Sequence, residues 1–402
     1  MAGLRGCPSM ICDTQVMQSN APILSLFGGI GGFERGFTKA GFTGQIHTYE
    51  NWEPARSVLS KRFPGAVLHA DVQDIPNDMH DAHLVAAGFP CTDLSQAGKQ
   101  AGLDGTASGL ILGVLEKIRV AKPEWVMLEN VPNMLRLKQG NAIRVITETL
   151  ADAGYSWSYR ILDAQYFGVA QRRKRVFVLA SRNHDPARVL FRDLNEAAPR
   201  PMTNPSRRAD ANGFYWSEGN RGVGWGVGVV PTIKGSTTAG IPTSPAVWLP
   251  DAADDHRFRT PSIEALEMLQ GFTAGWTKAA PARDRWKLVG NAVAVPVVRW
   301  IAEGLKAYDE LDLVDLSRHL TGNGGWGWSG ALIDGHTATG KLPDALATGP
   351  LRREISLSRL LRERGSNALS QKAARGFTTR LQRSNLSYEQ NFMRDLVTYS
   401  GL

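Results

Sequence analysis

Residues 22–33 read PILSLFGGIGGF, a short apolar run that passes directly into a glycine-rich turn. The apolar residues are typical of a buried strand, and the following GFERGFTKAGF has the spacing of a helix. Glycines at 28, 29, 31 and 32 would let the backbone turn tightly and approach a ligand closely. We therefore predict a strand–turn–helix unit that binds a nucleotide-like ligand, which need not carry phosphate.

The alternation of short apolar runs and longer amphipathic stretches continues as far as residue 182. Apolar runs occur at 45–50, 83–89, 124–131 and 175–181, and amphipathic stretches occur at 54–63, 109–120 and 141–154. This order of elements predicts βαβ units and a mostly parallel sheet. We expect a doubly wound α/β fold.

The pattern changes after Arg182. Residues 183–257 are rich in Gly, Pro, Ser and Thr and show no helical period, which predicts a loop-rich module with short strands. Helical spacing returns at 261–272 and 294–308, and a Gly/Trp-rich patch at 321–330 precedes a basic segment. We predict a core at 20–182, an inserted module at 183–257, the return of the core at 258–310, and a basic extension at 311–402.

The charge of the chain favours a polyanionic partner. Its 402 residues carry a formal net charge of +8, and the segment from Arg352 to Arg383 holds nine Lys or Arg against two acids. Two interpretations of this segment stay open. Its helices contact a phosphate backbone, or they form a protein interface, a packed scaffold or a solvated face, since RLLRER and FTTRLQ mix Leu and Phe with the charges.

The cysteine count and the lengths of the apolar runs indicate the cellular compartment. Three cysteines cannot form a disulfide framework in a chain of this length, and no apolar run has the length of a membrane span or a signal peptide. We therefore expect a cytoplasmic protein with no membrane partner.

Two acids follow the glycine turn at offsets that suit a nucleotide-like ligand. Glu50 ends the next apolar run, 21 residues after Gly29, where a carboxylate accepts hydrogen bonds from ribose hydroxyls. Asp71 ends a third run and could accept from an adenine amino group. A glycine turn with a ribose acid suits NAD and S-adenosylmethionine equally, so an NAD oxidoreductase remains an alternative on these residues.

A thiol, a carboxylate and a group of cations occur at the ends of predicted strands. Pro90-Cys91 follows HLVAAGF, Glu129 ends EWVMLE, and QRRKR at 171–175 leads into VFVLA. Ligands of open α/β sheets bind outside the carboxyl ends of the strands. Nearby cations lower the pKa of a thiol and so favour the thiolate, which is the nucleophilic form. We expect the three groups to converge on one site.

At these residues the chain resembles the DNA cytosine-5 methyltransferases of bacterial and phage restriction-modification systems. The matching segments, in the family's order, are FGGIGGF, TYENWEPA, DVQDI, GFPCTDLSQAG, LENVPN, FGVAQRRKRVF, RFRTP and GNAVAVP. The resemblance covers most of residues 21–310. It implies a class I S-adenosylmethionine-dependent methyltransferase sheet with an inserted small target-recognition domain and a mainly helical C-terminal extension.

The resemblance also implies the chemistry. Cys91 is then the nucleophile that adds to carbon 6 of a flipped cytosine, Glu129 is the acid at ring nitrogen 3, and Arg173 and Arg175 support it. The implied cofactor is S-adenosylmethionine, with binding residues Phe27, Gly29, Gly31, Glu50, Asp71, Pro90 and Asn291.

Recognition of double-stranded DNA follows from the same resemblance. Ser95 and Gln96 lie in a stretch that resembles the family's mobile catalytic loop. Candidates for contacts to phosphates and base edges in the inserted module are Arg207, Arg208, Asn220, Arg221 and Lys234. The implied context is a system with a cognate restriction endonuclease. The sequence indicates no other protein partner and no metal site.

Two departures and two alternatives accompany this interpretation. Ala107-Ser108 stands where the family often has Arg before Ser, and the stretch 260–272 is slightly longer than usual. An RNA cytosine-5 methyltransferase is one alternative, because some members of the family act on tRNA. A catalytically weak DNA-binding relative is the other, but it would be expected to lose Cys91 or Glu129, and both are present.

Overall fold

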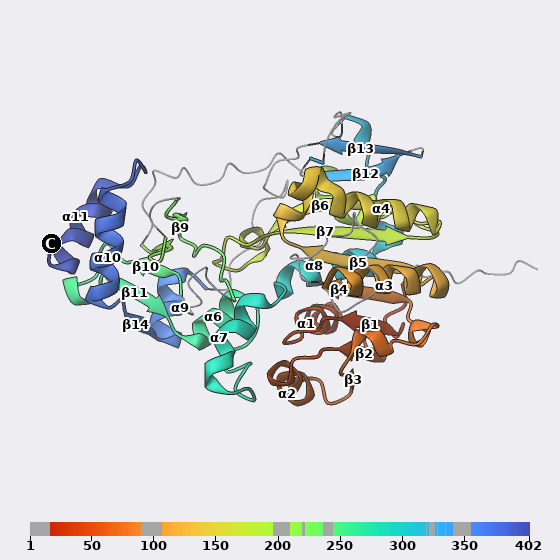
Figure 1. The fold of residues 1–402 in the computed structure, drawn as a ribbon, viewed down its shortest axis with the longest axis horizontal. Coiled ribbons are helices and arrows are strands. Elements are labelled where there is room, and N and C mark those ends of the chain that lie inside the picture. Colours follow the sequence, from red (N-terminus) through yellow and green to blue (C-terminus); the bar gives the residue numbers. More distant parts are fainter. Residues whose placement is uncertain are drawn as a thin grey trace, which may run out of the picture.

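The computed structural model describes residues 17–89, 107–195, 210–218, 222–235, 244–318, 320, 326–327, 329–333, 335–340 and 355–402. Within these ranges the chain forms a nine-stranded and a five-stranded sheet. Figure 1 shows the two sheets toward opposite ends of an elongated molecule, with helices α6 (Ile263–Leu269) and α7 (Ala282–Asn291) between them.

The large sheet has a parallel half and an antiparallel half. The parallel strands, in spatial order, are β3 (Val67–His69), β2 (Ile46–Tyr49), β1 (Ile23–Leu26), β4 (Leu84–Gly88) and β5 (Trp125–Asn130). Beyond β5 the antiparallel strands follow in the order β7 (Lys174–Ser181), β6 (Ser156–Asp163), β12 (Ser329–Ile333) and β13 (His336–Gly340). The carboxyl ends of the parallel strands therefore share one edge.

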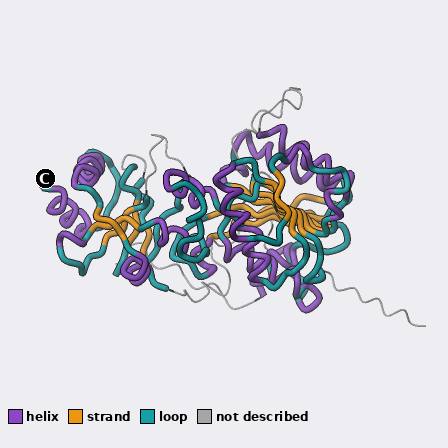
Figure 2. The backbone as a smooth tube through the Cα atoms, turned by 90° about the horizontal axis from the view of Figure 1, so that it is seen from below, coloured by secondary structure: helices purple, strands orange, loops and turns teal. Residues whose placement is uncertain are grey.

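Helices cover both faces of the large sheet, as Figure 2 shows. Alternate residues of a strand point to opposite faces, so Ile23 packs in one apolar cluster and Leu24 in the other. The first cluster is completed by α1 (Gly32–Lys39), α5 (Ala187–Leu190) and α8 (Val295–Lys306). The second is completed by α3 (Ala107–Ala121) and α4 (Asn141–Asp152). The doubly wound α/β fold predicted from the sequence is confirmed.

The small sheet gathers strands from three distant parts of the chain. Its order is β14 (Ser366–Ala368), β11 (Phe258–Pro261), β10 (Ala246–Trp248), β8 (Asn212–Phe214) and β9 (Gly226–Val227), all antiparallel. Helices α10 (Gln371–Gln382) and α11 (Gln390–Ser400) cover it through an aromatic core, whose rings are Phe214, Trp248, Phe258, Phe377 and Phe392. The C-terminal helices thus belong to this small domain.

The structure divides the chain differently from the expected boundaries at 257 and 311. β11 lies after the expected end of the inserted module, yet it pairs with β10 because the buried Phe258 ring packs in the aromatic core. The segment after 311 divides between the two sheets. The β12–β13 hairpin extends the large sheet, whereas β14 and the helices join the small one.

A third apolar cluster joins helices from several parts of the chain. α9 (Leu357–Arg364) packs with α6 and α7, and this apolar cluster also contains Ala55 and Val58 of α2 (Glu53–Arg62). Among the described residues, no single helix has the length and apolar composition to cross a membrane. The pair α7 and α8, bent by 44°, meets that criterion only when taken together.

Candidate active site

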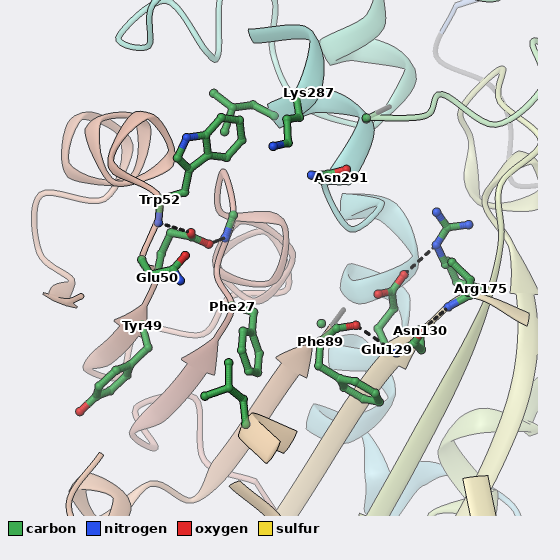
Figure 3. A pocket seen from close by; sticks show the side chains of 18 of the residues that line it. Phe27, Tyr49, Glu50, Trp52, Phe89, Glu129, Asn130, Arg175, Lys287 and Asn291 are labelled. Atoms are coloured by element: carbon green, nitrogen blue, oxygen red, sulfur yellow. Dashed lines mark hydrogen bonds and ion pairs between the residues drawn. The ribbon is translucent and has the colours of Figure 1, made fainter. Parts of the chain in front are cut away.

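A cavity of about 840 Å³ opens at the carboxyl ends of β1, β2, β4 and β5. This is the edge at which parallel α/β sheets bind their ligands. Figure 3 shows two groups of side chains facing it, with Glu50 and Trp52 on one side and Glu129 with Arg175 on the other. Residues of the link to the small domain, 232–235, complete the wall.

The glycine turn lies at the floor of this cavity. Phe27, Gly29 and Gly31 have φ of 58°, 58° and 88°, in the left-handed region that favours glycine. A Cβ on Gly31 would lie 2.3 Å from Phe63 Cε2, whereas a Cβ on Gly29 would meet nothing within 4 Å. Gly31 is therefore required by packing, while Gly29, which lines the cavity, leaves space beside the backbone.

Glu50 holds the glycine turn against the end of β2. Its Oε2 accepts a hydrogen bond from Gly29 N at 2.8 Å, and its Oε1 accepts from Trp52 N at 2.7 Å. A carboxylate has about four acceptor positions, so two remain for a ligand. The sequence placed Glu50 at this turn, and the structure brings the two together.

Three further predicted or neighbouring residues, Asp71, Lys287 and Asn291, line the cavity. Asp71 is exposed and caps the following turn by accepting from Gln73 N at 2.9 Å. Asn291 lies at the end of α7, and Lys287 of that helix places Nζ 4.7 Å from the centre of the Trp52 ring. Neither Trp52 nor Lys287 was predicted from the sequence. Trp52 could have been found from the sequence, because it is an aromatic residue two positions after Glu50.

Glu129 provides a buried acid at the end of β5. Glu129 is 7% exposed, and Arg175 Nε lies 3.1 Å from Glu129 Oε1. Burial raises the pKa of this carboxyl, while the positive charges of Arg175 and Arg173 oppose the shift. The carboxyl can therefore hold a proton at a pH where an exposed glutamate is ionised.

Arg173 has a role that the sequence did not indicate. Its guanidinium is buried and donates to Ile233 O at 3.0 Å and to Ala292 O at 2.7 Å. It thereby joins the link to the small domain with the segment before α8. Burial and the neighbouring Arg175 lower the pKa of Arg173. The positive charge of Arg173 still favours the ionised form of Glu129. Its N–H groups, however, donate to backbone carbonyls and not to Glu129.

Asn130 fixes the end of β4 beside Glu129. Its Nδ2 donates to Phe89 O at 3.0 Å, and its Oδ1 accepts from Val131 N at 2.8 Å. Phe89 is the last described residue before Pro90-Cys91. The sequence contained this amide in LENVPN, but its partner could be found only from the pairing of β4 with β5.

Several predicted residues lie outside the described ranges: Pro90, Cys91, Ser95, Gln96, Arg207, Arg208, Asn220 and Arg221. Of the predicted DNA-contacting residues, Lys234 is described and lines the cavity. Its Nζ forms an ion pair with Glu218 and lies 4.2 Å from the centre of the Tyr215 ring.

Comparison with known proteins identifies the family. Residues 22–214 match the family described as C-5 cytosine-specific DNA methylase. The chain is 44% identical over 297 residues to the type II methyltransferase M2.BsuMI of Bacillus subtilis (strain 168), covering 70% of this chain and 75% of that protein. It is 30% identical over 311 residues to the type II methyltransferase M.NlaX of Neisseria lactamica, covering 71% and 96%.

The chain belongs to the C-5 cytosine-specific DNA methylase family. It is an enzyme, a DNA (cytosine-5)-methyltransferase, as the sequence motifs predicted. Solved structures share the fold. The S. pombe Dnmt2 methyltransferase has a TM-score of 0.55 at 17% identity, covering 71% of this chain and 98% of that one. The Entamoeba histolytica methyltransferase EhMeth has a TM-score of 0.51 at 16% identity, covering 73% and 100%.

Proposed function

We propose that this enzyme transfers a methyl group from S-adenosylmethionine to carbon 5 of a cytosine flipped out of a specific double-stranded DNA sequence. The observation that supports this most directly is the buried Glu129–Arg175 pair. It faces the same cavity as the Gly29–Glu50 turn and adjoins the strand that leads into Pro90-Cys91.

The cofactor-side residues fit S-adenosylmethionine. Glu50 has acceptor positions left for ribose hydroxyls. Asp71 and Trp52 line the same cavity, where Asp71 would accept from an amino group of the base and the Trp52 ring would stack on it. Gly29 leaves room for close approach, and Phe27, Gly31, Pro90 and Asn291 belong to the same proposed site. When bound, the cofactor supplies an electrophilic sulfonium methyl group.

The protein's own residues activate the cytosine. The Cys91 thiolate adds to carbon 6 while protonated Glu129 donates its proton to ring nitrogen 3, which makes carbon 5 nucleophilic. After carbon 5 is methylated, its proton passes to water and the Cys91 thiolate is expelled, while ring nitrogen 3 returns its proton to Glu129, which restores the neutral aromatic ring. Arg175 orients the Glu129 carboxyl, and Arg173 holds the wall behind it.

Base flipping follows from the position of the target atom. Carbon 6 of a stacked cytosine is inaccessible to a thiol, so the base must leave the duplex at a cost of a few kcal/mol. The cavity of about 840 Å³ is large enough for a cofactor and a pyrimidine together. Ser95 and Gln96 are proposed to contact the DNA beside the flipped base.

We assign target recognition to the small domain, formed by the described residues between 210 and 261 together with 355–402. The proposed contacts come from Arg207, Arg208, Asn220, Arg221 and Lys234. Because Lys234 already pairs with Glu218, its contact with a phosphate or base would require it to exchange partners. The relatives' type II names favour a restriction-modification context with a cognate endonuclease, acting on DNA in a bacterial cytoplasm.

Bisulfite sequencing of DNA from cells that express the chain tests this proposal. We expect one short sequence context to be methylated at cytosine carbon 5, and no methylation in cells that express Cys91→Ser. A duplex with 5-fluorocytosine at the target should trap the wild-type protein covalently, because fluorine cannot leave as a proton. The proposal would be contradicted if tRNA were methylated while the DNA stayed unmodified. It would also be contradicted if cognate DNA formed no covalent adduct.

A further inference from the structure

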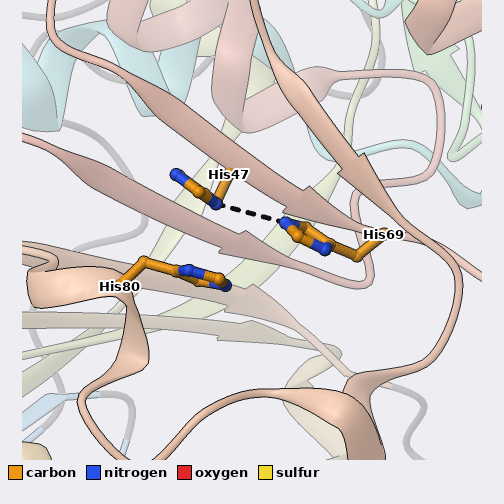
Figure 4. Close-up of side chains that lie close together, drawn as sticks. All are labelled: His47, His69 and His80. Atoms are coloured by element: carbon orange, nitrogen blue, oxygen red, sulfur yellow. Dashed lines mark hydrogen bonds between the residues drawn. The ribbon is translucent and has the colours of Figure 1, made fainter.

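Three histidines lie together at the outer edge of the large sheet, outside the active-site cavity (Figure 4). His47 is in β2, His69 ends β3, and His80 lies in the 3₁₀ turn η2 (Met79–Asp81). His47 Nδ1 and His69 Nε2 are 3.1 Å apart, and one nitrogen from each ring lies within 4.8 Å of the other two. Within the described ranges, no other group of three or more His, Cys, Asp or Glu side chains has this spacing.

The fold brings these rings together through sheet register. Tyr49 is opposite His69, and His47 precedes Tyr49 by two residues, so all three side chains share one face. His80 comes from the following loop. Its φ of 58° is in the left-handed region, and its backbone N–H donates to Asp78 Oδ1 at 2.9 Å. In this conformation the His80 ring lies 3.9 Å from that of His47, measured between centroids.

We propose that His47, His69 and His80 bind a divalent transition-metal ion, with Zn²⁺ as the preferred ion and water completing the coordination. Imidazole nitrogen binds Zn²⁺ at about 2.0–2.1 Å, which places two ligands of a tetrahedral site about 3.3 Å apart. The His47–His69 nitrogen separation is close to this value. The ring planes are within 25° of one another, so binding turns each ring about its Cβ–Cγ bond to direct a lone pair at the ion.

The surroundings favour a cation. Burial lowers the pKa of both His47 and His69, and the neighbouring imidazoles add to this effect. Metal ions bind the neutral form of imidazole. Burial raises the pKa of Tyr49 beside the triad, and the nearby carboxylates of Asp74 and Asp78 add to this effect. All three histidines are half-buried, so an ion can enter from solvent.

A bound ion would stiffen one wall of the active-site cavity. The Tyr49 hydroxyl lies 2.9 Å from His80 Nε2, and the Tyr49 ring stacks on His69 with centroids 4.3 Å apart. Tyr49 lines the cavity, and Glu50 N donates to His69 O at 3.0 Å. The ion would link β2, β3 and η2 next to Glu50, so we expect Zn²⁺ to raise the melting temperature of the protein.

Titration of the full chain, without an affinity tag, with Zn²⁺ and with Co²⁺ tests the site. We expect one Zn²⁺ per chain, together with visible d–d absorption from Co²⁺ that lacks the near-ultraviolet charge-transfer band of a thiolate ligand. The band distinguishes this site from Cys7, Cys12 and Cys91. His80→Gln should weaken Zn²⁺ binding by at least about tenfold and abolish the rise in melting temperature.

His336→Gln is the matched control, because His336 is exposed on β13 at the opposite edge of the sheet. It should leave the affinity for Zn²⁺ unchanged. His69→Gln should repeat the effect of His80→Gln, so the result does not depend on the folding of one variant. A stoichiometry well below one, equal Zn²⁺ affinity in the wild-type and His80→Gln proteins, or a thiolate band that accounts for the Co²⁺ would overturn the proposal.

Discussion

The Glu129 carboxyl can be tested without changing its shape. Glu129→Gln keeps the size and burial of the side chain but removes the exchangeable proton. We expect kcat to fall by about two to four orders of magnitude, the usual range for general-acid catalysis. The affinity for S-adenosylmethionine should change little, because Glu50 and Trp52 lie on the other side of the cavity.

Single-turnover methylation and calorimetric titration of the cofactor measure the two effects separately. Glu148→Gln is the control, since Glu148 is exposed on α4. Turnover close to that of the wild type would place the acid on another residue.

The Glu129 carboxyl should also make the enzyme's activity depend on pH. Burial raises the pKa of Glu129 and Arg175 opposes the shift. The proposed acid must be protonated, so activity is present below this pKa and is lost as the pH rises through it. Arg175→Met removes the opposing charge, and we expect the alkaline limb of the kcat/KM profile to move to higher pH, together with a lower rate. Lys61→Met, which changes an exposed cation on α2, should leave the limb in place. A shift to lower pH would refute the assignment.

At the scale of the element, α10 supports the part of the small domain that precedes residues 219–221. Arg380 donates through Nε to Glu218 O at 3.1 Å and through one terminal nitrogen to Trp216 O at 2.9 Å. We expect Arg380→Ala to reduce the discrimination between cognate and non-cognate DNA by about tenfold, because hydrogen bonds from a charged donor contribute about 1.5–3 kcal/mol. Competitive binding assays measure this ratio.

Lys372 is the matched control, because it is an exposed cation on the same helix. Lys372→Ala should weaken cognate and non-cognate binding equally, since phosphate contacts position the protein without reading sequence. Equal discrimination in the wild-type and Arg380→Ala proteins would show that α10 does not support recognition.

At the scale of the whole molecule, the C-terminal segment completes the small domain. Phe377, Leu381 and Phe392 are fully buried against Phe214 and Trp248. Truncation after Gly340 removes β14 and α9–α11 and exposes this core. We expect loss of sequence-specific DNA binding and increased binding of a hydrophobic dye, while the cofactor still binds to the large-sheet domain. Retained sequence preference in a monomeric truncated protein would contradict this expectation.

A neutralised variant separates packing from charge. Arg362, Arg364, Lys372 and Arg383 are exposed, so their replacement by Gln should preserve the fold. Each lost phosphate contact should reduce the slope of log affinity against log salt by about 0.9. An unchanged slope in this folded variant would mean that the basic residues do not contact DNA. From the sequence alone, residues 352–383 could be a phosphate-binding segment or a packed scaffold. The structure places the apolar residues of RLLRER and FTTRLQ in the core.

The sequence alone determined the local elements of the catalytic half. The order of apolar runs and amphipathic stretches predicted a buried strand in PILSLF, and β1 (Ile23–Leu26) lies there. Glu50 and Glu129 were predictable because each ends an apolar run. It also determined the family, because the motifs occur in a fixed order along the chain.

Only the tertiary structure decided which distant segments meet. β14 and β11 pair across 107 residues, and the hairpin β12–β13 joins the large sheet far from β6 in sequence. The backbone contacts of Arg173 and the meeting of His47, His69 and His80 have the same origin. Strand register and burial depend on long-range packing, and no local pattern of residue types specifies which partner a strand edge or a buried donor will find.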